Sequence, residues 1–225
     1  MHRWGLGLAL LCAVAATAAE HTLADAMGKM DQAAAGFKGL SANVEYVSHM
    51  EAIHEDDSEI GTMLVKRPNA NSLHVKIAIE KPDPKVAVTD GKRVDVYYPR
   101  SGEAETILLD HRKSQVNMIL ALGFGGTSKD LLRSYDVTLI GPDTIGGESA
   151  MRLELIPKTK DMLEQWKKIE LWISDKTGYT LQQKFYDRGK DYTLITYTKI
   201  QPNPEIPESA FNLPKGTKRQ PLNKK

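Results

Sequence analysis

The sequence predicts a mainly β protein: a strongly curved, largely antiparallel sheet of about eleven strands, with one helix leading and a helical insertion midway. Several segments alternate apolar and polar residues, as Met151, Leu153 and Leu155 do around Arg152 and Glu154. Short turn sequences separate many segments, and short connections join antiparallel neighbours because a parallel crossover needs a dozen or more residues. The strands are expected over residues 40–50, 60–67, 72–80, 85–89, 93–98, 104–109, 135–141, 149–157, 168–174, 179–187 and 191–201.

A helix is expected ahead of the first strand, from Thr22 to about Phe37. Gly36 and Gly39 suit its end, since glycine is favoured just past a helix C-terminus. Apolar residues fall at helical spacing on one face, which should pack on the sheet. They are Leu23, Met27, Met30, Ala34 and Phe37.

The helical insertion is expected where the strand pattern breaks. Residues 114–122 are apolar and compatible with a short helix, and the glycine-rich residues 123–126 end that stretch. Thr127 or Ser128 can then cap a second short helix that runs through Arg133.

The first residues are expected to be an export signal. A short positive start precedes an apolar run over residues 4–15, and Ala16-Thr17-Ala18 supplies the small residues that a signal peptidase needs. The run is too short to span a bilayer, which takes roughly 20 apolar residues. We therefore expect a signal peptide over residues 1–19, cleaved after Ala18 or Ala19.

The chain has one cysteine, Cys12, which lies inside that apolar run. Two leucines precede it, whereas a lipid-anchored cysteine needs a small residue directly before it, so a lipid anchor is disfavoured. After cleavage the mature chain contains no cysteine, which excludes disulfides and thiol catalysis. We expect residues 20–225 to form one domain, with a long polar connection at 158–168 and a loose basic tail at 215–225.

Composition and motifs argue against several classes of function. Lys and Arg number 30 against 29 Asp and Glu, a balance that gives no reason to expect nucleic acid. The sequence has no nucleophile elbow, zinc-protease motif or phosphate loop, so we expect neither an enzyme nor a cofactor. Metal-ligand types gather around His49 and His54, but across an expected hairpin; we interpret them as a solvated turn and expect no metal.

The periodicity permits an apolar cavity without requiring one. A sheet of about eleven strands rolls up because each strand pair twists, and a large barrel encloses a ligand space where a small one fills with side chains. Met27, Met30 and Met118 in the expected helices can adapt to varied apolar shapes. The same residues also fit an ordinary core.

Three motifs carry a resemblance to a known family. Residues 61–69 read Gly-Thr-Met-Leu-Val-Lys-Arg-Pro-Asn, and residues 89–99 contain an Asp-Gly-Lys hairpin that leads to Tyr-Tyr-Pro. Residues 206–216 contain Ile-Pro, then Phe211, then Pro-Lys-Gly. In order and spacing, and with the export signal and leading helix, they resemble the outer-membrane lipoprotein carrier (LolA) family over nearly all of the mature chain.

The resemblance implies an incomplete, unclosed antiparallel β-barrel with helices as a lid. It implies a periplasmic carrier, working as a monomer, that shelters the acyl chains of lipoproteins in an apolar cavity. Its partners would be lipoproteins, an inner-membrane lipoprotein-releasing complex and an outer-membrane lipoprotein receptor.

The same resemblance implies roles for particular residues. Arg67 corresponds to the arginine that ties the lid to the barrel in the closed state, and its donors suit backbone carbonyls on a lid loop. The expected mid-chain helix corresponds to the lid helix of the family. The expected acyl contacts in the cavity and lid are Leu23, Met27, Met30, Phe37, Leu64, Met118, Ile119 and Leu122.

The chain departs from the family pattern at Asp95, where the family often has tryptophan, and in the polar residues after Pro68. These departures leave the cargo open. The alternative hypothesis is a binding module of the same fold that carries another lipid, or that senses lipids or misfolded envelope proteins. An exported enzyme would need a histidine beside a carboxylate in the cavity, which the sequence does not indicate.

Overall fold

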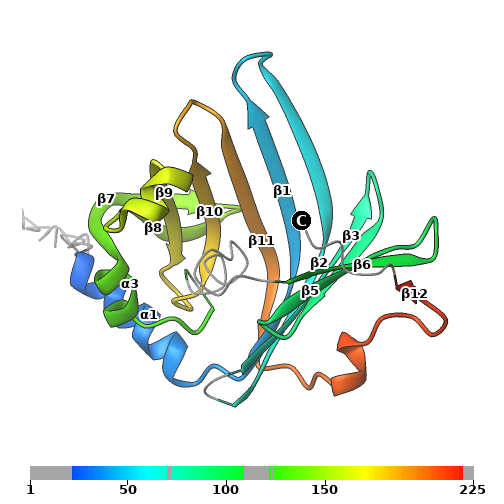
Figure 1. The fold of residues 1–225 in the computed structure, drawn as a ribbon. Helices are drawn as coiled ribbons and strands as arrows, with labels where there is room; N and C mark the ends of the chain where they lie inside the picture. Colours follow the sequence, from blue (N-terminus) through cyan, green and yellow to red (C-terminus); the bar gives the residue numbers. More distant parts are fainter. Residues whose placement is uncertain (1–21, 70–71, 109–121, 123, 220–225) are drawn as a thin grey trace, which may run out of the picture.

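Twelve strands form one sheet, with α1 and α3 against one of its faces (Figure 1). The structure, a computed structural model, describes residues 22–69, 72–108, 122 and 124–219. The helices are α1 (Leu23–Ala35), α3 (Ser128–Ser134), α4 (Lys160–Gln165) and the 3-10 helix η1 (Glu208–Phe211). The strands are β1 (Gly39–Met50), β2 (Glu55–Asn69), β3 (Ser72–Lys81), β4 (Lys85–Thr89), β5 (Arg93–Tyr98), β6 (Glu103–Leu108), β7 (Tyr135–Ile145), β8 (Glu148–Pro157), β9 (Lys168–Ser174), β10 (Thr180–Tyr186), β11 (Tyr192–Pro202) and β12 (Lys218–Arg219).

The strand order is β12-β6-β5-β4-β3-β2-β1-β11-β10-β9-β8-β7. Neighbours are antiparallel except for β12, which pairs in parallel with β6. β1 pairs with both β2 and β11, so early and late parts of the chain meet in the middle of the sheet. β7 and β12 are the two edges, and within the described chain they do not pair with each other. The predicted fold class, a curved and unclosed antiparallel sheet, is confirmed (Figure 1).

Helix α1 begins at a capping box. The hydroxyl of Thr22 accepts a hydrogen bond from the Asp25 backbone at 3.1 Å, and the Asp25 carboxylate accepts one from the Thr22 backbone at 3.0 Å. Two donors that the first helical turn leaves without partners are thereby satisfied. The apolar side of the helix buries Ala26, Met27 and Met30 against the sheet. The helix predicted to begin at Thr22 is confirmed.

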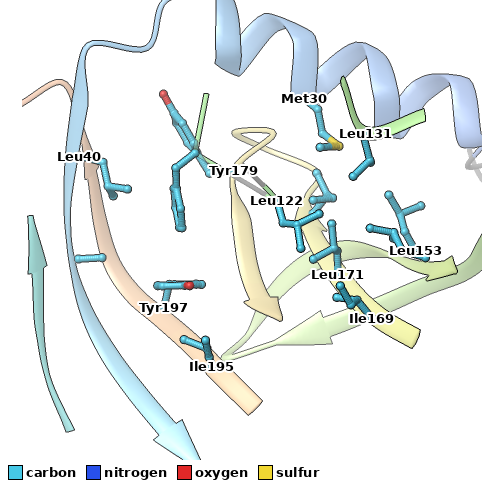
Figure 2. Packing of buried hydrophobic residues seen from close by; sticks show 14 of the residues in the cluster. Met30, Leu40, Leu122, Leu131, Leu153, Ile169, Leu171, Tyr179, Ile195 and Tyr197 are labelled. Carbon is cyan, nitrogen blue, oxygen red and sulfur yellow. The ribbon is translucent and has the colours of Figure 1, made fainter. Parts of the chain in front are cut away.

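We call the face of the sheet that carries α1 the inner face, and its described side chains are mostly apolar. The alternation predicted for β8 is confirmed, since Leu153 and Leu155 are fully buried and Glu154 between them is not. In β9, Leu171 is the direct partner of Leu153, but both faces of this strand are buried after Lys168. Figure 2 shows how these side chains meet those of the helices. The buried apolar strand residues of this cluster are Leu40, Ala42, Val44, Met63, Val65, Val75, Tyr135, Met151, Leu153, Leu155, Ile169, Leu171, Ile173, Phe185, Ile195 and Tyr197.

The second predicted short helix is confirmed as α3. Thr127 caps it by accepting a hydrogen bond from the Asp130 backbone at 3.2 Å. The expected helical residues 114–121 lie outside the described residues. Three elements were not predicted: α4 forms within the expected polar connection, η1 lies between β11 and the tail, and β12 forms within the expected loose tail. All three are too short to show an apolar period.

After β11 the chain crosses the outer face of the sheet. Lys66 in β2 donates to the Ile206 carbonyl at 2.8 Å and pairs with Glu208 at 2.6 Å. Lys76 in β3 donates to the Ala210 carbonyl at 3.0 Å. The segment around η1 is thus fastened to the side of the sheet opposite α1.

Asp95, where the sequence departs from the family pattern, lies on the outer face. Its carboxylate accepts a hydrogen bond from the Thr106 hydroxyl at 2.7 Å and pairs with Arg219 in β12 at 3.4 Å. This buried carboxylate therefore helps to hold the end of the described chain and does not face the inner surface.

Replacing Gly61 by alanine is expected to lower the free energy of unfolding by about 1–3 kcal/mol, the usual cost of overpacking. A β-carbon at this buried position in β2 would overlap the Ala78 carbonyl in β3. The matched change Gly28→Ala, at an exposed position in α1 with open space around it, should raise the free energy by up to about 1 kcal/mol. Urea denaturation measures both, and equal midpoints would contradict the close approach of β2 and β3.

Candidate functional site

Arg67, near the end of β2, joins three segments of the chain. Its backbone N–H donates to the Lys38 carbonyl at 2.8 Å, in the connection between α1 and β1. Its Nη2 donates to the Gly125 carbonyl at 3.2 Å, and its Cζ lies 5.1 Å from the centre of the Phe37 ring. A guanidinium over an aromatic face adds a cation–π attraction to the hydrogen bond.

We call Leu122 and residues 124–127 the mid-chain segment, which precedes α3. Gly125 in this segment has φ +81°, a conformation that favours glycine. A β-carbon on Gly125 would lie 2.6 Å from Nη2 of Arg67 and 2.6 Å from Cδ1 of Phe37. From the sequence, the glycines of this stretch were expected only to stop a helix; the structure adds that Gly125 leaves room for the arginine.

Asn203, just after β11, fixes the connection that carries Phe37. Its Oδ1 accepts hydrogen bonds from the backbone of Lys38 at 2.7 Å and of Gly39 at 3.2 Å, and its Nδ2 donates to the Gly36 carbonyl at 2.8 Å. Its φ of +52° suits asparagine, which tolerates this region better than most residues. This residue was not predicted from the sequence, because its partners lie at the other end of the chain.

The mid-chain segment is fastened at both of its ends. Beyond its last residue, Ser128 donates from its backbone and its hydroxyl to the Asp31 carboxylate in α1, at 2.7 and 2.6 Å. At its start, the Leu122 carbonyl accepts from Oγ1 of Thr180 at 3.0 Å and from Nε2 of Gln183 at 3.4 Å. Thr180 and Gln183 belong to β10 and are fully buried.

Tyr197 in β11 extends this buried polar group. Its hydroxyl donates to Oε1 of Gln183 at 3.2 Å, and Phe124 packs edge-on against its ring at a centroid distance of 4.9 Å. Burial raises the pKa of Tyr197 well above its ordinary value, so the hydroxyl keeps its proton at neutral pH. From the sequence, Tyr197 was interpreted only as a sheet former. Gln183 could have been found as a polar residue two positions before the inward-facing Phe185.

The structure brings together most of the described residues expected to contact acyl chains. Met27, Met30, Phe37 and Leu122 are buried in one cluster, and the half-buried Leu23 packs against it. Figure 2 shows Met30 and Leu122 within this cluster. Leu64 is not part of this group. It pairs with Ser41 and Lys76 on the outer face, where it lines a hollow of about 410 Å³. Met118 and Ile119 lie outside the described residues.

Apolar side chains continue on the inner face beyond the part that α1 and α3 cover, beside charged ones such as Glu105, which pairs with Val96. Ile77 in β3 and Val96 in β5 are only half-buried, and Ile107 in β6 is 51% exposed. Strand pairing places these side chains on the same face as Met63. Figure 1 shows α1 and α3 at the β7–β10 end of the sheet, away from β5 and β6.

Other groups in the described chain suggest no second centre of chemistry. The part of the chain that the structure describes has no cluster of three or more His, Cys, Asp and Glu side chains that could hold a metal ion. His49, expected in a solvated turn, pairs with Asp56 at 2.6 Å and Glu51 at 3.2 Å, and these hydrogen bonds raise the pKa of His49. Of the helices described, none is long and apolar enough to cross a membrane.

Comparison with known proteins identifies the family. The family model for the outer membrane lipoprotein carrier protein LolA matches residues 36–214. The outer-membrane lipoprotein carrier protein of Pseudomonas putida (strain GB-1) is 30% identical over 158 residues, 69% of each chain, and that of Pseudomonas fluorescens (strain Pf0-1) is 27% identical over 181 residues, 80% of each chain.

A solved structure also shows the fold. An uncharacterized conserved protein from Thermus thermophilus superposes with a TM-score of 0.55 at 13% identity, covering 88% of this chain and 97% of that one. The resemblance drawn from the three sequence motifs is confirmed by the family match. The chain belongs to the LolA family of outer-membrane lipoprotein carrier proteins, which are transport proteins and not enzymes.

Proposed function

We propose that this protein holds the acyl chains of lipoproteins against its apolar inner face and carries them through the periplasm. The donor would be an inner-membrane lipoprotein-releasing complex and the acceptor an outer-membrane lipoprotein receptor. The observation that carries the proposal is the contact of Arg67 with Gly125 and Phe37, which fastens the mid-chain segment beside the apolar cluster of the inner face. Family membership and the export signal expected over residues 1–19 support the same assignment.

Acyl chains need such a surface because water excludes them. Covering a chain is worth about 0.8 kcal/mol per CH₂ group, so a lipoprotein cannot cross an aqueous compartment unless a protein buries that area. A carrier must also release its cargo. A cover closed by a few hydrogen bonds, each worth about 0.5–1.5 kcal/mol net, can be opened by contact with a partner.

We assign the lid role to Arg67, the mid-chain segment and α1. Arg67 would hold the lid closed in the empty form, and its guanidinium would let go of the Gly125 carbonyl when cargo enters. The proposed acyl contacts exclude Leu64, which faces outward. They are Leu23, Met27, Met30, Phe37, Met118, Ile119 and Leu122.

Arg67→Leu is expected to bind a fluorescent palmitate analogue about tenfold more tightly than the wild type. The closed form loses a hydrogen bond from a charged donor, worth about 1.5 kcal/mol, while the open form loses nothing. Fluorescence titration of the purified mature chain measures the change. Arg100→Leu is the control, because Arg100 is 74% exposed and pairs only with Asp83 among the described residues. If Arg67→Leu and Arg100→Leu both bind as the wild type does, Arg67 does not close the lid.

Gly125→Ala is expected to tighten binding of the same palmitate analogue by a similar factor, because its β-carbon would displace the Arg67 guanidinium. The control is Gly91→Ala. Gly91 has a similar φ of +87°, so both variants carry the same backbone strain, but no atom lies near its β-carbon. Equal affinities of the two variants would show that the steric contact at Gly125 is unimportant for closure.

A further inference from the structure

We propose that Thr180 and Gln183 are positioning residues of a second, buried latch. The latch holds the mid-chain segment closed, and when the segment opens, the same two side chains weaken the binding of acyl chains. This inference rests on the proposed carrier function. It concerns the opposite end of the segment from Arg67. There the Leu122 carbonyl accepts hydrogen bonds from both side chains, at 3.0 and 3.4 Å.

A β-bulge places the two side chains on one face. In a regular strand, residues three positions apart face opposite sides of the sheet. In β10 the register shifts between Thr180 and Gln182, so Thr180 lies opposite Ile173 and Gln183 lies opposite Leu171. Leu181 is the extra residue. Bulges often re-aim side chains next to functional sites, and this one turns two polar groups inward together.

The latch lies inside the apolar cluster. Thr180 and Gln183 are 0% exposed, and Leu122 is 1% exposed. Figure 2 shows Leu122 between Tyr197 and Ile195 on one side and Leu153 and Leu171 on the other. The Tyr197 hydroxyl donates to Oε1 of Gln183, which orients the amide so that its Nε2 points to the Leu122 carbonyl.

The environment distinguishes this latch from Arg67. The guanidinium of Arg67 is only partly buried, so water can replace the Gly125 carbonyl when the lid opens. At Thr180 and Gln183 the free-energy cost of opening depends on which group replaces the Leu122 carbonyl. Water can satisfy the hydroxyl and the amide, whereas an acyl chain cannot, and a buried donor without a partner is costly. The two side chains therefore favour the closed form and penalise the loaded form, which assists release.

The test is the affinity of the purified mature chain for a fluorescent palmitate analogue. The double variant Thr180→Val/Gln183→Leu removes the two donors and nearly keeps the side-chain shapes. It should bind the analogue about tenfold more tightly than the wild type, and a change in fold stability alone would not produce this gain. When the double variant is combined with Arg67→Leu, the two increases in affinity should multiply, because the two sets of contacts hold different ends of one segment.

The neighbouring residues offer a matched control. Gln182 and Thr196 also form a glutamine–threonine pair, with Nε2 of Gln182 donating to Oγ1 of Thr196 at 2.8 Å, but they lie on the outer face. The double variant Gln182→Leu/Thr196→Val should leave the affinity unchanged. Tyr197→Phe is a milder change that keeps the ring packing and removes the donor to Gln183. It should tighten binding in the same direction by a smaller factor, and it serves if the double variant does not fold.

The outcomes separate the latch from the carrier proposal. Tighter binding by the inner-face variants, with the outer-face control unchanged, supports the latch. If Arg67→Leu binds more tightly while the inner-face double variant and Tyr197→Phe match the wild type, the latch is wrong and the carrier function stands. If neither wild type nor any variant binds the palmitate analogue, the carrier function fails and the latch fails with it.

Discussion

The apolar inner face of an unclosed sheet has to be covered, and the arrangement of the other elements depends on this requirement. In a closed barrel the opposite strands would cover one another, but here the edges β7 and β12 are not paired in the described chain. Helix α1 and the mid-chain segment cover the β7–β10 end of the face instead. Their apolar side chains belong to the same cluster as those of the strands. Packing therefore positions the helix and the segment, and hydrogen bonds hold them in place.

The fastening bonds differ in their access to water. The bonds of Asp31 to Ser128 are exposed, the Arg67 contact is partly buried, and the bonds of Thr180 and Gln183 are fully buried. Because a hydrogen bond near water is exchanged at little net cost, the outer bonds are suited to opening. The bonds of Thr180 and Gln183 have no such access to water. In the proposed function, a partner would break the outer contacts and the buried contacts would respond to an apolar ligand.

The outer face has the opposite character. Glu170 accepts hydrogen bonds from Lys168 and Arg152, each at 2.8 Å. Burial opposes ionisation of this carboxyl, but the two cations outweigh it and lower its pKa. Together with the return of the chain across β2 and β3, these pairs keep this side of the sheet polar. Among the described residues, the large apolar cluster that includes α1 lies on the inner face.

Much of the fold was predictable because its signals are local. Thr22 with Asp25 marks the start of α1, and the alternation in β8 marks a strand with one buried face. The errors come from information that is not local. Met63, Leu64 and Val65 are all apolar, so periodicity does not tell which of them faces inward, and pairing with β1 and β3 decides against Leu64.

In the candidate site, too, some residues could be predicted from local sequence signals and others could not. Arg67 was identified through a motif, whereas Thr180 faces inward only because of the bulge at Leu181. A bulge is a property of two paired strands and leaves no mark in one of them. Asn203 was missed for a related reason, since its partners lie more than 160 residues away in the sequence.

The most direct test of the proposed carrier function is mass spectrometry of the lipids and lipoproteins that co-purify with the protein from a periplasmic extract of its source cells, comparing the wild type with Arg67→Leu. We predict acylated lipoproteins on both forms, with more on Arg67→Leu because its lid no longer drives release. A different lipid on both forms would contradict the lipoprotein cargo, and no apolar ligand on either would contradict the carrier function itself.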